Sequence, residues 1–141
     1  MKNYITEYSR KVNSGEINTS RRIKAVYSRL AAATVDRTGQ YVFDEAKANR
    51  PIEFIERFCK HSKGEWAGQP VRLELFQKAY IQALFGFVDK DTGFRQYRES
   101  FFLVGRKNGK STLLAGLSLY MLTSDGEGGA EVYSTATMLC L

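Results

Sequence analysis

Apolar residues recur at helical spacing along much of the chain. This spacing predicts helices over residues 19–33 and 71–87, where one side of each segment is apolar. Between them, residues 43–62 predict two shorter helices. The first would be capped by Asp44, and the second would begin near Pro51, because proline suits the first turn of a helix.

Two other apolar stretches favour β-strands on either side of a helix. Residues 101–104, FFLV, form a continuous apolar run typical of strands covered on both faces, and the DTG turn before them predicts a hairpin between Val88 and Phe94. A helix is expected over residues 111–122, and the β-forming residues EVYSTATM follow at 131–138. The order strand, loop, helix, loop, strand predicts a βαβ unit, and therefore an α/β fold preceded by N-terminal helices.

The loop between the first of these strands and the helix reads VGRKNGKST and begins at Val104. Gly105 and Gly109 permit backbone angles that other residues avoid, and Asn108 also tolerates them. The helix that follows offers backbone N–H groups without intrahelical partners at the positive end of its dipole. Such a turn suits a phosphate chain, so the sequence predicts a phosphate-binding loop.

Two residues of this loop carry the chemistry that a bound nucleotide needs. Lys110 can reach the β- and γ-phosphates, and the hydroxyl of Ser111 can ligate Mg²⁺. The Gly-Lys-Ser triplet alone is weak support, and Val104 stands where the usual string has its first glycine. The flanking strand and helix favour phosphate binding over the alternative, an ordinary glycine-containing turn.

Composition narrows the class of protein. The 141 residues are 43% hydrophobic and 13% aromatic, which suits one globular domain. We see no apolar run long enough to span a membrane and no signal peptide, so we expect a cytoplasmic protein with no membrane partner. The two cysteines lie far apart and the single histidine has no histidine partner, which disfavours a metal or disulfide scaffold.

The net charge of +6 originates in the N-terminal part of the chain. Residues 1–63 hold 13 Lys and Arg against 7 Asp and Glu, whereas residues 64–141 hold 8 against 8. A solvated helix face is the simplest interpretation of Arg21, Arg22 and Lys24. These side chains also leave open a second function class, a non-enzymatic DNA- or protein-binding adaptor with a vestigial loop.

The string VGRKNGKST, with Arg106 and Lys107 inside it, resembles the corresponding loop of the large terminase subunit of tailed double-stranded DNA phages. The resemblance covers residues 50–141 and includes FCKHSKGEWAGQPVRLELFQ and the continuation KAYIQALFGFVDKDTGFRQYRESFFL. It implies the N-terminal portion of a P-loop ATPase domain of the ASCE type over residues 50–141. Residues 1–49, which match the family less specifically, are expected from their charge and helical pattern to form a basic helical region. In that family a metal-dependent nuclease domain follows.

The resemblance also implies roles for single residues, with ATP and Mg²⁺ as cofactors. Gln77, in LELFQKA, matches the family's adenine-recognising glutamine, and Arg106 matches a loop arginine that senses the γ-phosphate. Ser111 would ligate Mg²⁺ through its hydroxyl. The alternatives are a solvent-facing helix residue for Gln77 and an ordinary exposed arginine for Arg106. The residues expected to hold the nucleotide are Gly105, Lys107, Asn108, Gly109, Lys110, Ser111, Thr112 and Gln77.

The sequence lacks a clear position for the other catalytic groups of such a motor. An ATPase of this class needs a Mg²⁺-binding acid after a later strand and a glutamate that orients water. Only Asp125, Glu127 and Glu131 follow the loop helix, in or beside the turn SDGEGGA. We therefore expect a truncated terminase reading frame or prophage remnant that binds ATP without hydrolysing it. Double-stranded DNA, the small terminase subunit and the portal would be partners of the complete motor, and an oligomer is expected only there.

A third function class is a small kinase-like phosphotransferase. It would use the same loop, but the sequence shows no base and no acceptor site for it.

Overall fold

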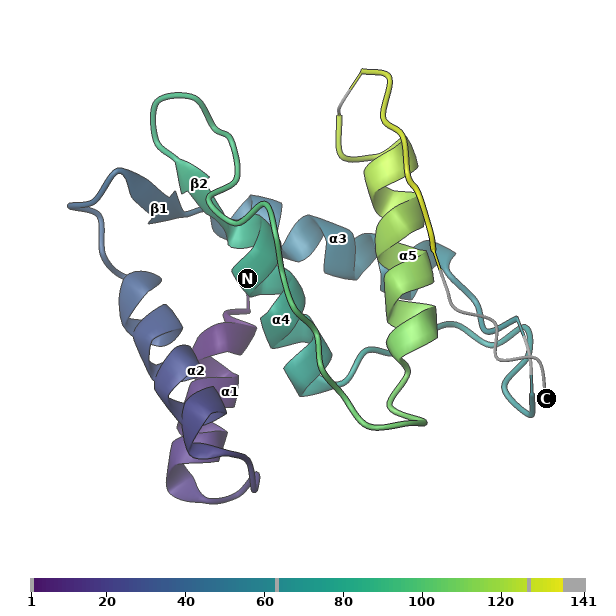
Figure 1. The fold of residues 1–141 in the computed structure, drawn as a ribbon, viewed down its shortest axis with the longest axis horizontal. Helices are drawn as coiled ribbons and strands as arrows, with labels where there is room; N and C mark the ends of the chain where they lie inside the picture. The colour runs from purple at the N-terminus through teal and green to yellow at the C-terminus, as the bar shows by residue number, and fades with distance from the viewer. Residues whose placement is uncertain (1, 63, 127, 136–141) are drawn as a thin grey trace.

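The structure is a computed structural model that describes residues 2–62, 64–126 and 128–135. It combines helices with one small sheet (Figure 1). In chain order the elements are α1 (Tyr4–Ser14), α2 (Arg21–Ala33), β1 (Tyr41–Phe43), α3 (Glu45–Phe58), α4 (Leu75–Gly86), β2 (Phe87–Asp89) and α5 (Lys110–Thr123). In Figure 1 helix α4 lies between the pair α1 and α2 on one side and α5 on the other.

The core has two apolar clusters, and α4 contributes to both. The first cluster joins α3, α4 and α5, and its buried residues are Ile52, Ile55, Val71, Leu73, Ile81, Phe85, Leu113, Leu117 and Tyr120. The second joins the N-terminal helices to the small sheet, and its buried residues are Ile5, Tyr8, Val12, Tyr27, Phe43, Ala48, Ala79 and Phe87. Because α4 lies between the two clusters, it is the central element of the fold.

A buried glutamine, Gln82, fixes α1 against α4 and α3. Its side-chain oxygen accepts hydrogen bonds from the backbone N–H groups of Tyr4 (2.7 Å) and Ile5 (3.2 Å). Its amide nitrogen donates to the Lys2 carbonyl (2.8 Å) and to the side-chain oxygen of Asn49 (2.9 Å). The N–H groups at the start of a helix have no partner within it, so Gln82 supplies the partner that two of these groups need.

The small sheet pairs two short strands that are far apart in sequence. β1 and β2 run antiparallel, with Val42 opposite Val88, and the rings of Phe43 and Phe87 lie 5.2 Å apart. β1 was not expected from the sequence, because three residues are too few for a clear alternating pattern.

The DTG turn is confirmed. The N–H of Asp89 donates to the Phe94 carbonyl (2.8 Å), and an isolated bridge joins Val88 to Arg95. The Asp89 carboxylate accepts from the N–H groups of Thr92 and Asp91, and these bonds hold its pKa below the ordinary value.

Three of the expected helices are confirmed with small shifts at their ends, but the prediction of two helices over residues 43–62 is wrong. Asp44 does cap a helix there, since its carboxylate accepts from the N–H of Lys47 (3.0 Å). That helix, α3, continues through Pro51 as a single element. Proline removes one backbone hydrogen bond from a helix interior, and the buried side chains of Ile52 and Ile55 compensate for that loss through packing.

The two strands of the expected βαβ unit are not formed in the described residues. Residues 101–104 are extended but unpaired, with Phe101 89% and Leu103 82% exposed, whereas the ring of Phe102 packs on Tyr80 of α4. The backbone N–H and C=O groups of a helix bond to one another. Residues 101–104, which lie against α4, therefore have no neighbouring strand with which to form the hydrogen bonds of a sheet.

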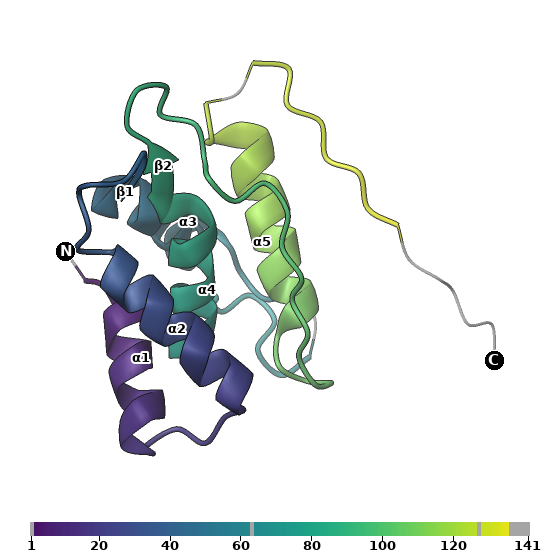
Figure 2. The same cartoon turned by 60° about the vertical axis from the view of Figure 1, so that its left-hand side comes forward.

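After α5, residues 131–135 are likewise exposed and unpaired, and they run away from the helices in Figure 2. The remainder of the expected second strand, residues 136–138, lies outside the described residues.

The proposed division into residues 1–49 and 50–141 stays a prediction. The boundary falls inside α3, and Gln82 bonds directly to residues of the N-terminal region. Across the described part of the chain, no helix combines the length and the apolar character needed to cross a lipid bilayer.

Replacing Gln82 with leucine should lower the free energy of unfolding by about 2–4 kcal/mol, because the buried N–H groups of Tyr4 and Ile5 would lose their acceptor. Urea denaturation of the two proteins measures this difference. Gln96→Leu, at an exposed position, is the matched control and should leave the midpoint nearly unchanged. Equal midpoints for Gln82→Leu and wild type would contradict the assignment.

Candidate functional site

The glycine-rich loop lies at the N-terminus of α5. Gly109 is the residue before the helix and adopts the left-handed conformation, with φ 69° and ψ 16°. Its carbonyl accepts the first helical hydrogen bond, from the N–H of Leu113 at 2.9 Å. A left-handed residue at this position turns the chain sharply into the helix, which explains the need for glycine.

The start of α5 presents unpaired backbone donors to solvent. Lys110 and Ser111 are exposed and Thr112 is half-buried, and in the described structure their N–H groups have no acceptor. No side chain caps this helix, in contrast to α1, α2 and α3, which are capped by Asn3, Ser20 and Asp44. An uncapped, exposed helix N-terminus favours a negatively charged group.

The loop itself is held by the side chain of Asn108. Its amide nitrogen donates to the carbonyls of Gly105 (3.2 Å) and Arg106 (3.3 Å), which closes a tight turn. Lys107 has a φ of 63°, and it is the single non-glycine residue of the described ranges with a positive φ. The sequence suggested Asn108 for this conformation, but its short amide is used for bonding to the turn instead.

Gln77 connects this loop to α4. The side chain is buried, with 5% of its surface exposed. Its amide nitrogen donates to the Asn108 carbonyl (3.1 Å), while its oxygen accepts from the N–H of Glu74 (2.9 Å). A Cβ added to Gly109 would lie 3.0 Å from the Gln77 amide nitrogen. The alternative of a solvent-facing helix residue is therefore wrong, and Gln77 is placed beside the loop.

The other site residues differ in their surroundings. Arg106, Lys107 and Lys110 are exposed, and in the described structure their side chains form no hydrogen bond or ion pair. Ser111 is also exposed at the helix start, so its hydroxyl is open to solvent. The structure thus gathers the predicted loop residues and Gln77 in one place.

The acidic residues after the loop helix are not part of this site. Asp125 lies just beyond the opposite end of α5, where its carboxylate pairs with Arg95 at 3.2 Å. Glu131 is exposed and accepts a hydrogen bond from the Tyr133 hydroxyl. Glu127 lies outside the described residues.

The basic residues of the N-terminal region lie on α2. Arg21 and Arg22 are exposed, and Lys24 is half-buried. This placement leaves the adaptor function as an untested prediction.

Sequence reasoning missed a second group of cations. Lys47 and Arg50 of α3 and Arg95 and Arg98 beyond β2 line one cavity of about 550 Å³. The two residues of each pair are three positions apart, but the two pairs are far apart in the chain, so no local motif marks the group. Only folding brings them together.

Comparison with known proteins finds a similarity in the second half of the chain. Residues 75–139 match the family described as terminase large subunit, ATPase domain. The large terminase subunit of Enterobacteria phage HK97 is 41% identical over 73 residues, which cover 52% of this chain and 13% of the phage protein. The match therefore spans a small part of that relative. No solved structure gives a significant match.

Replacing Gly109 with alanine should lower the free energy of unfolding by about 1–2 kcal/mol, since a Cβ is strained at this positive φ and crowds Gln77. Thermal or urea denaturation measures the change. Gly128→Ala is the control, because φ there is not positive and a Cβ would meet no atom within 4 Å. A Gly109→Ala protein as stable as the control would contradict the backbone assignment.

Proposed function

We propose that the chain belongs to the family of terminase large subunit ATPase domains, whose model matches residues 75–139, and that the loop of residues 105–112 is a nucleoside triphosphate-binding loop. The observation that carries the proposal is the uncapped, solvent-exposed start of α5 directly after the left-handed Gly109. There the unpaired N–H groups and the Lys110 side chain lie within two residues of each other. This donor set suits a phosphate chain.

The loop residues fit both ATP and Mg²⁺ chemically. Lys110 would neutralise charge on the outer phosphates, and the N–H groups of Ser111 and Thr112 would donate to phosphate oxygens. The exposed hydroxyl of Ser111 is an oxygen ligand of the kind that Mg²⁺ accepts beside a phosphate. Arg106 would pair with the terminal phosphate, since its guanidinium is free and exposed.

The main role of Gln77 in this site would be to hold the backbone of the loop in position. Its hydrogen bond fixes the direction of the Asn108 carbonyl. The carbonyl and the N–H of one peptide unit point in opposite directions, so the same bond turns the Gly109 N–H away from Gln77. Because both polar ends of the side chain are occupied, an adenine base would have to compete with the Glu74 N–H or the Asn108 carbonyl.

The proposed role of the chain is to supply the nucleotide-binding part of a DNA-packaging motor. The expected partners, double-stranded DNA, the small terminase subunit and the portal, belong to this proposal. We further propose that the described residues bind the nucleotide without hydrolysing it. Asp125 is held by Arg95 beyond the far end of α5, and Glu131 lies on the exposed segment beyond it, so neither is placed to orient water at the loop.

Replacing Lys110 with alanine should weaken binding of a fluorescent ATP analogue at least about tenfold, because a charge-assisted contact to phosphate would be lost. Equilibrium titration followed by fluorescence anisotropy measures the affinities. Lys90→Ala removes an exposed lysine of the turn after β2 and should have no effect. Unchanged affinity in the Lys110→Ala protein would exclude the loop as the nucleotide site.

Replacing Gln77 with methionine distinguishes two roles for this residue, support of the loop backbone and direct contact with the adenine base. If Gln77 holds the loop, the affinities for Mg²⁺-ATP and for Mg²⁺-tripolyphosphate should fall by a similar factor, about three- to tenfold for one lost hydrogen bond. Isothermal titration calorimetry with both ligands measures the two factors. Gln96→Met is the control at an exposed position. Weaker binding of ATP with unchanged binding of tripolyphosphate would instead assign Gln77 to adenine recognition.

A further inference from the structure

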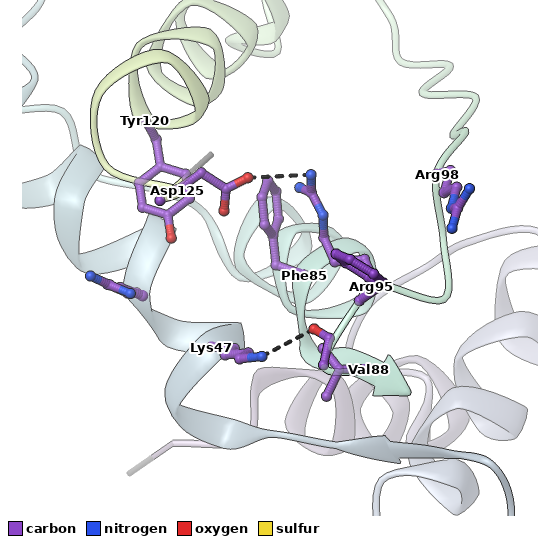
Figure 3. Close-up of a pocket in the computed structure, with 11 residues that line it drawn as sticks. Lys47, Phe85, Val88, Arg95, Arg98, Tyr120 and Asp125 are labelled. Carbon is purple, nitrogen blue, oxygen red and sulfur yellow. Dashed lines mark hydrogen bonds and ion pairs between the residues drawn. The ribbon is translucent and has the colours of Figure 1, made fainter. Parts of the chain in front are cut away.

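A cavity beyond the far end of α5 gathers four cationic side chains around an apolar floor (Figure 3). Its volume of about 550 Å³ lies within the range of small-molecule sites, roughly 300–1,000 Å³. The floor is formed by the buried residues Phe85, Val88 and Tyr120. The cavity is separate from the glycine-rich loop, which lies at the opposite end of α5.

The charges around the cavity are unbalanced. Lys47, Arg50, Arg95 and Arg98 face one carboxylate among the described lining residues, that of Asp125. Arg95 is paired with this carboxylate at 3.2 Å. Like charges gathered at one concave surface repel each other, and a bound anion would relieve that repulsion.

Two of the four cations remain available for a ligand. Lys47 donates to the Gly93 carbonyl at 3.1 Å, and Arg95 lies over the Phe85 ring in addition to its ion pair. Arg50 and Arg98 are exposed, and they form neither a hydrogen bond nor an ion pair with any described residue. Their guanidinium groups therefore keep all of their donors free.

The hydroxyl of a largely buried tyrosine provides a second, independent observation. Tyr120 is only 3% exposed, and its hydroxyl forms no hydrogen bond in the described parts of the chain. No fully buried side-chain oxygen lacks a partner there, so this hydroxyl keeps some access to solvent. In Figure 3 this hydroxyl points toward the space bordered by Lys47 and Phe85. Burial and the nearby Asp125 carboxylate raise the pKa of the phenol, while Arg50 and Arg95 act in the opposite direction. The phenol stays protonated at neutral pH and is a donor.

We propose that this cavity binds a small organic phosphate, with its phosphate group between Arg50 and the Tyr120 hydroxyl. These two groups interact electrostatically. Guanidinium groups donate in pairs to phosphate oxygens, and the phenol adds one donor from below. The apolar part of the ligand would lie over Phe85 and Val88. The ring of Phe94, 68% exposed at the edge of the cavity, is a surface on which a planar group can stack.

Two-dimensional NMR of the ¹⁵N-labelled full chain tests this site directly, with sodium pyrophosphate and adenosine monophosphate as probes. The amide signals of Gly93, Arg95 and Gly126 should shift and saturate, and they should do so equally in the Lys110→Ala protein. Equal shifts in the Lys110→Ala protein separate this proposal from the proposed function of the loop. Loss of ATP binding at the loop would leave binding in the cavity unaffected, and loss of binding in the cavity would leave the loop unaffected. Saturating shifts confined to residues 105–112 would overturn the proposal.

Two variants define the contacts. Tyr120→Phe removes only the hydroxyl and keeps the edge-to-face packing of the ring on Phe54 and Phe85, so the fold is retained. It should weaken binding of both probes about tenfold, as should Arg50→Gln. Arg22→Gln removes an exposed arginine of α2 and should change nothing. If Tyr120→Phe and Arg50→Gln bind like wild type, these side chains are ordinary solvated or buried groups and the proposal fails.

Competing ligands test which chemical class of anion the cavity prefers. Citrate carries several carboxylates, and a short DNA duplex carries phosphates on a rigid backbone. Both should bind more weakly than pyrophosphate or adenosine monophosphate at the same ionic strength. Tighter binding of citrate, or of the duplex with the same residues shifted, would overturn the assignment to a small organic phosphate.

Discussion

The hydrogen bonds of Gln82 are the interaction on which the arrangement of the helices depends. This buried side chain uses both ends of its amide, and it joins the start of α1 to α3 and α4. An apolar residue of the same size would fill the space but leave the first N–H groups of α1 buried and unpaired. The amide of Gln82 therefore stabilises the position of α1 against the second apolar cluster.

A second glutamine, Gln77, plays a similar part at the other end of α4. It joins the first turn of that helix to the glycine-rich loop, and the loop in turn starts α5. α5 is also fixed from the side, since a Cβ on Gly116 would lie 3.0 Å from Ile55 of α3. The position of the loop thus follows from packing at Gly116 and from one amide bond. The basic cavity, in contrast, depends on where the segment after β2 crosses the end of α5.

Local patterns predicted most of the helices and the residues of the loop, because helix formation and capping depend on neighbours in sequence. They failed where the decisive partner is distant. The apolar run at 101–104 lies on the surface of α4 without a pairing strand, so it is not a strand despite its composition. The sequence predicts a helix start near Pro51, but α3 continues through this residue because Ile52 and Ile55 are buried.

Distant partners also limited what the sequence could predict about the glycine-rich loop and the basic cavity. The sequence identified the loop residues and singled out Gln77, but the bond of Gln77 to Asn108 spans 31 positions and was not foreseen. The cavity cations come from separate segments and carried no signal at all.

The positions of Gln77 and Gln82 on one helix have a mechanical consequence. A helix of this length is stiff along its axis, so two side chains five residues apart keep a fixed spacing. One of them holds the loop and the other holds α1. Any displacement of the loop that preserves the Gln77 bond must carry α4, and with it α1, as one unit. A displacement that leaves α1 at rest must first break that bond, so a single amide sets whether movement at the loop is transmitted or absorbed.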